Sequence, residues 1–106
     1  MDADIKREWV AALRSGEYKQ GRGQLCIDDH YCCLGVLYDA CIDGEWVRGP
    51  GGGWSIGPHG VQTANLPFPV CDAIGLRLGD QDRLIRMNDG GHKSFAQIAD
   101  WIEANL

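Results

Sequence analysis

Residues 32–42 read CCLGVLYDACI, an apolar run near the middle of the 106-residue chain. Its larger side chains, Leu34, Leu37, Tyr38 and Cys41, recur at helical spacing, and most positions between them are apolar too. This pattern predicts a helix that is buried on nearly all sides. Because a glycine inside a helix costs about 1 kcal/mol relative to alanine, Gly35 predicts that another backbone packs closely at this point, most simply that of another helix.

Two amphipathic helices are predicted toward the ends of the chain. Residues 3–14 place Ile5, Trp9 and Leu13 four apart, and Gly16 follows them. At the other end, Ser94 and Gln97 form the pattern of a capping box. The helix that begins there carries apolar residues on one face, namely Phe95, Ile98, Ala99, Ile102 and Leu106.

Shorter elements are predicted between these helices. Residues 23–31 predict a small hairpin with its turn at 28–29, and the tryptophans at 46 and 54 lie in two strands of a second hairpin whose glycine-rich loop, 49–53, should be mobile. Residues 70–75 and 80–88 predict two short helices, the second ended by residues 88–91, NDGG. We therefore expect an α+β fold: one helix-rich domain, residues 1–106, with one or two short β-hairpins around a buried central helix.

Composition excludes several classes of function. A net charge of −5 gives no field that would attract DNA or RNA. No apolar run approaches the length of a membrane span, and the acidic start MDADIKREWV does not resemble a secretion signal, so we expect a cytoplasmic protein. Five cysteines are an odd number without such a signal, which favours buried, reduced thiols over disulfides, and their spacing does not suit zinc. No metal or cofactor is predicted.

Charge is distributed unevenly along the sequence. The stretch 14–24, RSGEYKQGRGQ, carries Arg14, Lys19 and Arg22 against Glu17. The following stretch, 25–45, contains five acidic residues and neither lysine nor arginine. The first stretch is a candidate contact for an anion, although a solvated surface loop explains it as well.

Two further features suit a phosphorylated, planar ligand. Residues 88–94, NDGGHKS, bring His92 and Lys93 to the amino end of a helix, where free amides favour an anion, although an ordinary helix cap has the same composition. Trp46 and Trp54 flank the glycine-rich loop and could stack on a nucleobase, although a cross-strand pair in the core would use the same residues. The candidate ligand-binding residues are Arg14, Tyr18, Lys19, Arg22, Trp46, Trp54, His92 and Lys93.

A nucleophilic alternative is based on Cys33. This cysteine opens the central helix as Cys33-Leu34-Gly35, and a helix amino end can lower the pKa of a thiol. The segment resembles the nucleophile helix of papain-like cell-wall peptidases, which implies a cysteine hydrolase. Neither His59, in a turn-rich stretch, nor His92, at a helix cap, occupies the strand position that the base of such an enzyme needs. No catalytic residue is therefore assigned, and an enzyme is the less favoured class.

Three segments together, WVAALRSGEYKQGRG, YCCLGVLYDAC and LIRMNDGGHKSFAQIADWIEANL, resemble a family of small tailed-bacteriophage proteins. The resemblance implies an accessory protein of the host cytoplasm that blunts host defence. It would do so by sequestering a phosphorylated nucleotide signal or by binding a host defence protein. Because a small domain buries limited area, a tight nucleotide site would form most easily in a homo-oligomer.

Overall fold

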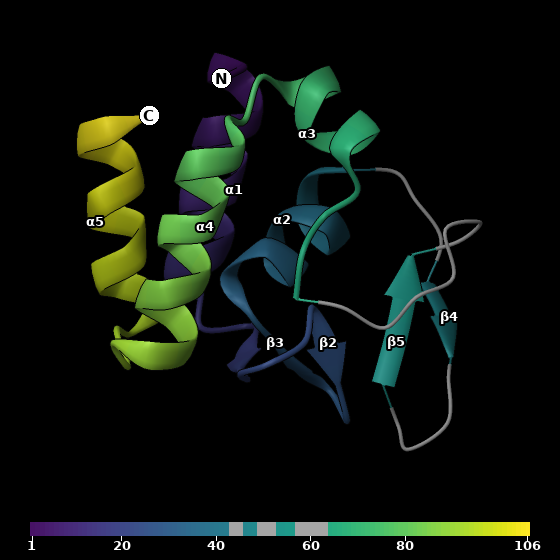
Figure 1. Cartoon of the computed structure of the whole chain (residues 1–106). Helices are drawn as coiled ribbons and strands as arrows, with labels where there is room; N and C mark the ends of the chain where they lie inside the picture. Colours follow the sequence, from purple (N-terminus) through teal and green to yellow (C-terminus); the bar gives the residue numbers. More distant parts are fainter. Residues whose placement is uncertain (43–45, 49–52, 57–63) are drawn as a thin grey trace.

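The computed structural model describes residues 1–42, 46–48, 53–56 and 64–106. In chain order the elements are α1 (Ala3–Arg14), β1 (Lys19–Gln20), β2 (Cys26–Ile27), β3 (His30–Tyr31), α2 (Cys33–Cys41), β4 (Trp46–Arg48), β5 (Gly53–Ile56), α3 (Phe68–Ile74), α4 (Leu78–Ile85), the π-helical turn η2 (Arg86–Gly90) and α5 (Phe95–Asn105). The predicted α+β class is confirmed: helices surround a buried central helix, and short hairpins lie beside it (Figure 1).

The central helix α2 is buried from Cys33 to Tyr38. Gly35 explains how it can lie so close to the sheet, because a Cβ on this residue would overlap the Leu25 carbonyl group. The backbone that approaches Gly35 therefore belongs to the segment leading into β2, where the sequence had suggested another helix. Trp9 of α1 donates its indole N–H to the Cys33 carbonyl oxygen at 2.9 Å, which ties the amino end of α2 to α1.

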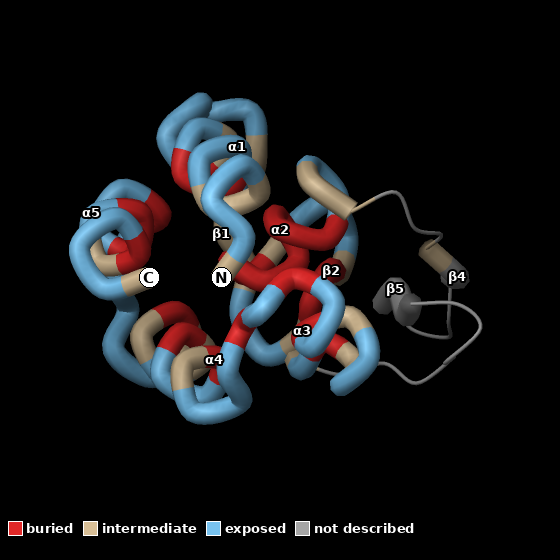
Figure 2. Tube along the Cα trace, turned by 90° about the horizontal axis from the view of Figure 1, so that it is seen from above, coloured by how far each residue is buried: buried red, intermediate tan, exposed pale blue. Residues whose placement is uncertain are grey.

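Helices α1 and α5 both have side-chain caps at their amino ends, and that of α5 is the predicted one. Asp2 accepts a hydrogen bond from the Ile5 amide, and Ser94 and Gln97 form the complete capping box of α5. The two helices run beside each other, with α4 alongside, and their buried positions face inward (Figures 1 and 2). Trp9, Leu13, Ile98 and Ile102 lie in the single hydrophobic core cluster that the described residues form.

The five short strands form one sheet in the order β1-β3-β2-β5-β4. β2 and β3 make the predicted hairpin, with Cys26 opposite Tyr31, and Asp28 and Asp29 form its turn with positive φ angles of 47° and 65°. β4 and β5 make the second hairpin, which lies on the side of the molecule away from α5 (Figure 1). Its glycine-rich tip, including the mobility predicted for it, lies outside the described residues, which resume at Gly53.

The segment from α3 to η2 departs in one place from the prediction. Gly75 ends α3 in the left-handed conformation at φ 74°, as its position predicts. Residues 88–91, however, do not simply end the following helix. Asn88 lies inside a π-helical turn with its side chain wholly buried. The sequence N-D-G-G thus contains a buried polar side chain, that of Asn88, whose hydrogen bonds organise the candidate site.

No helix in the described part of the chain is long and apolar enough to cross a membrane.

Candidate functional site

Asn88 joins three segments that are far apart in the sequence. Its Oδ1 accepts hydrogen bonds from Gln20 Nε2 at 2.9 Å and from the Cys33 amide at 3.3 Å. Its Nδ2 donates to the Gly21 carbonyl oxygen and to Asp89 Oδ1, both at 2.8 Å. All four hydrogen-bonding positions of the side chain are thus used, as a buried amide requires. The sequence reasoning missed this residue, because N-D-G-G reads as a turn.

The Asn88 network places two basic segments side by side. Gln20 Nε2 also donates to the Lys93 carbonyl oxygen at 2.7 Å, so the strand that carries Lys19 is joined directly to the turn before α5. Asn88 donates a hydrogen bond to the carbonyl oxygen of Gly21, and Arg22 is the next residue. His92 directly precedes Lys93. We call the exposed basic residues of these two joined segments, Lys19, Arg22, His92 and Lys93, the cationic surface. Within it, the Lys19 side chain points to the sheet face opposite Gln20. The structure therefore unites two segments that the sequence treated as separate anion contacts.

Arg14 does not belong to this surface. Its guanidinium forms ion pairs with Asp100 at 2.7 Å and with Glu103 at 3.1 Å, both on α5. The hydrogen bond that Arg14 donates to Glu103, followed by the one it donates to Asp100, raises the pKa of Arg14, and the contact with Arg14 lowers the pKa of Glu103. Arg14 was predicted to contact phosphate, but its charge is already compensated because it joins α1 to α5. We remove it from the candidate set.

Tyr18 and Trp46 lie in an aromatic cluster on the inner side of the sheet. The Tyr18 ring meets Tyr31 edge-on at 5.0 Å, Tyr31 meets Trp46 at 6.1 Å, and Tyr38 meets Trp46 at 4.9 Å. Asp39 accepts hydrogen bonds from both ends of this cluster, from the Tyr18 hydroxyl at 2.7 Å and from the Trp46 indole at 3.1 Å. Burial, followed by the Asp39 contact, raises the pKa of Tyr18. These rings are thus held in fixed orientations.

The strand register places Lys19 and the aromatic cluster on opposite faces of the sheet. Lys19 pairs with His30, and Gln20 pairs with Tyr31. Because successive side chains point to opposite faces of a sheet, Lys19 and His30 lie on one face, and Gln20 and Tyr31 lie on the other. The face of Tyr31 is the one that carries the aromatic cluster. The register therefore separates Lys19 from the aromatic rings, whereas Gln20, which contacts the Lys93 segment, lies on the same face as the rings. The side chain of Trp54 and all of His59 lie outside the described residues.

Cys33 does not have the properties of a nucleophile. Its side chain is wholly buried, and its thiol lies 3.7 Å from the Leu84 carbonyl oxygen. Burial, more than any other effect, raises the pKa of the Cys33 thiol well above its ordinary value. A reactive cysteine needs a lowered pKa and access to substrate, and this residue has neither. All five cysteines are free thiols, and four of them are buried, as the sequence predicted.

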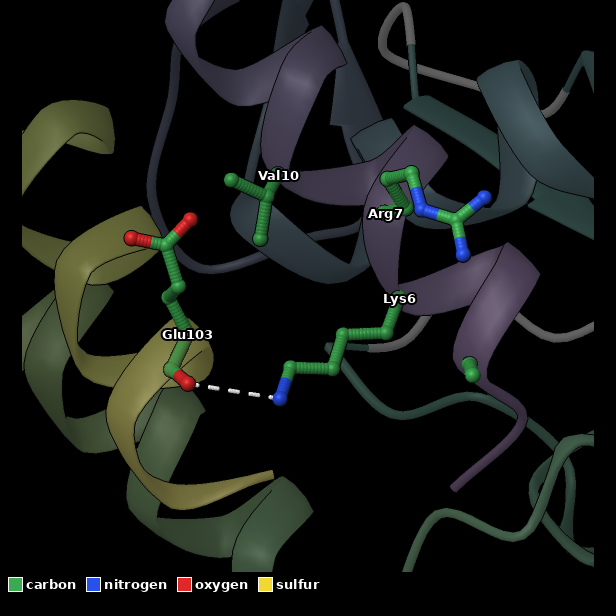
Figure 3. Close-up of a pocket in the computed structure, with 5 residues that line it drawn as sticks. Lys6, Arg7, Val10 and Glu103 are labelled. Carbon is green, nitrogen blue, oxygen red and sulfur yellow. Dashed lines mark hydrogen bonds between the residues drawn. The ribbon is translucent and has the colours of Figure 1, made fainter.

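Several depressions of the described part of the chain lie outside the predicted residues, two of them beside α1 and α3. One, of about 280 Å³, lies between α1 and α5 and is lined by Ala3, Lys6, Arg7, Val10 and Glu103. There Lys6 Nζ donates to the Glu103 carbonyl oxygen at 3.3 Å (Figure 3). The other, of about 240 Å³, lies between α3 and α4, where Phe68 and Leu78 are 62% and 52% exposed. In the described part of the chain, no group of three or more histidine, cysteine or acidic residues could hold a metal ion.

The first part of the chain matches a known protein family. Residues 1–49 match the model of a family described as a domain of unknown function, DUF8296. The match includes α1, the first hairpin and α2 but ends before α3, α4 and α5. It thus includes two members of the cationic surface, Lys19 and Arg22, and leaves out His92 and Lys93. No curated protein and no solved structure matches the chain. The similarity of residues 1–49 to this family therefore indicates no activity.

Proposed function

We propose that the protein is a non-enzymatic binder of a phosphorylated nucleotide, and that the cationic surface holds the phosphate groups. The observation that carries this proposal is the Asn88 network, which holds the segments of Lys19, Arg22, His92 and Lys93 together across about 70 positions of sequence. Exposed lysine and arginine side chains from two fixed segments can contact neighbouring phosphate oxygens with little loss of backbone entropy.

A binder fits this arrangement better than an enzyme. Lysine and arginine bind phosphate through charge and hydrogen bonds, and neither needs a perturbed pKa to do so. The nucleophile suggested by the sequence, Cys33, is wholly buried, and this burial raises the pKa of its thiol. The base contact of Trp46 is not part of this proposal, because the register places Lys19 on the other face of the sheet.

The biological setting of the proposal comes from the resemblance to small tailed-phage proteins. On that basis the protein is an accessory protein of the infected cell that sequesters a nucleotide immune signal. Such a binder removes its ligand without converting it, so each binding site removes one molecule at a time. It must therefore be abundant relative to the signal and must release the ligand slowly. A homo-oligomer would present several cationic surfaces at once.

Thermal denaturation in the presence of candidate ligands tests the proposal. A panel of cyclic dinucleotides, cyclic oligonucleotides and ADP-ribose derivatives should contain at least one compound that raises the melting temperature. At a hundredfold excess over the dissociation constant, the gain is about 2.7 kcal/mol. The shift should decrease with added salt, because the contacts are electrostatic and exposed.

Substitutions locate the site. Arg22→Ala and Lys93→Ala should each reduce the shift, whereas Arg77→Ala, which removes another exposed cation, between α3 and α4, should leave it unchanged. A panel without any shift would contradict the proposal. The exposed Phe68 and Leu78 side chains would then be the first place to test for a host protein partner, the alternative left open by the sequence.

A further inference from the structure

A pocket with the opposite electrostatic character lies on the inner face of the sheet. It has a volume of about 210 Å³ and is lined by Cys26, Asp29, Tyr31 and Trp46. We call it the aromatic pocket. Its lining contains no residue of the cationic surface. No part of the proposed nucleotide function uses it.

The walls of the aromatic pocket are nearly perpendicular to each other. The planes of the Tyr31 and Trp46 rings make an angle of 72°, and the planes of the Tyr38 and Trp46 rings make an angle of 79°. Parallel rings would form a slot for a flat nucleobase, whereas perpendicular rings form a corner that suits a compact group. The indole N–H of Trp46 is held by Asp39, which fixes the direction of the ring face. The pocket is therefore organised before any ligand arrives.

The electrostatic surroundings of the aromatic pocket favour a positive charge. Asp29 lines it, and the Asp29 carboxylate accepts no hydrogen bond from any described residue. Asp39 lies behind the rings, and residues 25–45 include no lysine or arginine. Burial, followed by the negative charges around it, raises the pKa of Tyr31 to about 12. A metal ion would find two of its usual ligand types in the lining, Cys26 and Asp29, which is too few for a closed site.

We propose that the aromatic pocket binds the compact ammonium group of an organic cation. The faces of Tyr31 and Trp46 attract a cation through their π electrons, and the Asp29 carboxylate adds a direct charge contact. A methylated ammonium suits this combination best, because its methyl groups fill an apolar corner while its charge remains diffuse. The overall charge of −5 also increases the local concentration of cations around the protein.

Titration with a matched pair of probes tests the proposal. Choline and 3,3-dimethyl-1-butanol have the same shape and differ in the positive charge of the nitrogen. On ¹⁵N-labelled protein, choline should shift the Trp46 indole N–H resonance in a saturable way, and the neutral probe should bind at least tenfold more weakly. Trp46→Phe, which lacks this resonance, identifies it among the four tryptophans.

Variants extend the test to individual side chains. Asp29→Asn should weaken choline binding about threefold or more, and Trp46→Leu about tenfold or more. Asp82→Asn, which removes an exposed carboxylate on α4, should change nothing. If Trp46→Leu does not fold, the matched probes and Asp29→Asn still decide the matter. Equal binding of both probes, or no saturable shift of the Trp46 resonance, would overturn the proposal.

Discussion

Gly35 of α2 lies against the backbone of Leu25 so closely that a Cβ atom on the glycine would overlap the Leu25 carbonyl oxygen. Both residues are buried, and the contact joins the central helix to the start of β2. The hairpin of β2 and β3 carries Tyr31 and hydrogen-bonds to the strand of Lys19. The positions of the cationic surface and of the aromatic pocket therefore both depend on the contact between Gly35 and Leu25.

Gly35→Ala should therefore destabilise the fold strongly, by about 2–4 kcal/mol, because a backbone must move to admit one methyl group. Gly79→Ala is the matched control. Gly79 also lies in a helix but has open space around it, so alanine should stabilise by about 0.5–1 kcal/mol. Urea unfolding of the two variants measures both changes. Equal effects would show that the close approach of Gly35 to Leu25 is not required.

Asn88→Asp should lower the free energy of unfolding by about 2–4 kcal/mol at neutral pH. The new carboxylate cannot donate to the Gly21 carbonyl oxygen, and it repels Asp89 in a wholly buried position. Because burial would raise the pKa of this carboxyl, the loss should be smaller at pH 4–5, where the group is protonated. Asp89→Asn keeps an acceptor for Asn88 and serves as control. A variant as stable as the parent would disprove the role of the network.

Stability should fall as the pH rises above 9, in part because of Cys32. Burial raises the pKa of this thiol from 9.0 to about 11 in the folded chain. The contribution is fully present below pH 9 and is lost as the pH rises through 11, since the unfolded chain releases the proton more easily. The loss attributable to one thiol is at most about 1.4 kcal/mol per pH unit. Cys32→Ala should flatten the slope of stability against pH between 9 and 11, and an unchanged slope would contradict the assignment.

Arg14→Met should lower the melting temperature by a modest amount that disappears at high salt. The substitution keeps an apolar stem but removes the ion pairs with Asp100 and Glu103. Because Arg14 lowers the pKa of Glu103, this contribution is present at neutral pH and is lost as the pH falls through that pKa. Arg7→Met removes a more exposed pair within α1 and should have a smaller effect. A salt-independent difference would indicate that packing, and not charge, is responsible.

Much of the fold could be predicted because several elements carry their own signals. α1 and α5 combine an apolar face with a capping residue, and α3 ends at a glycine that adopts the left-handed conformation. The turn at Asp28 and Asp29 followed from two short alternating runs around acidic residues. These patterns are local, so one sequence suffices to find them.

The arrangement of the site could not be predicted in the same way. The sequence N-D-G-G is the same whether Asn88 faces solvent or is buried, and only tertiary contacts decide between the two. The register of a two-residue strand likewise has no periodic signal, yet it determines that Lys19 and Tyr31 face opposite sides of the sheet. Arg14 appeared available because its partners are 86 and 89 positions away.

The pairing of α1 with α5 has a consequence for the order in which the chain acquires its structure. Trp9, Val10 and Leu13 of α1 are shielded from water in the finished protein, and α5 contributes Ile98 and Ile102 to the same core. During synthesis α1 leaves the ribosome before α5, so the apolar face of α1 stays partly uncovered until α5 is made. A nascent chain that stops before Phe95 would lack the Arg14 ion pairs and would expose this surface to chaperones and proteases.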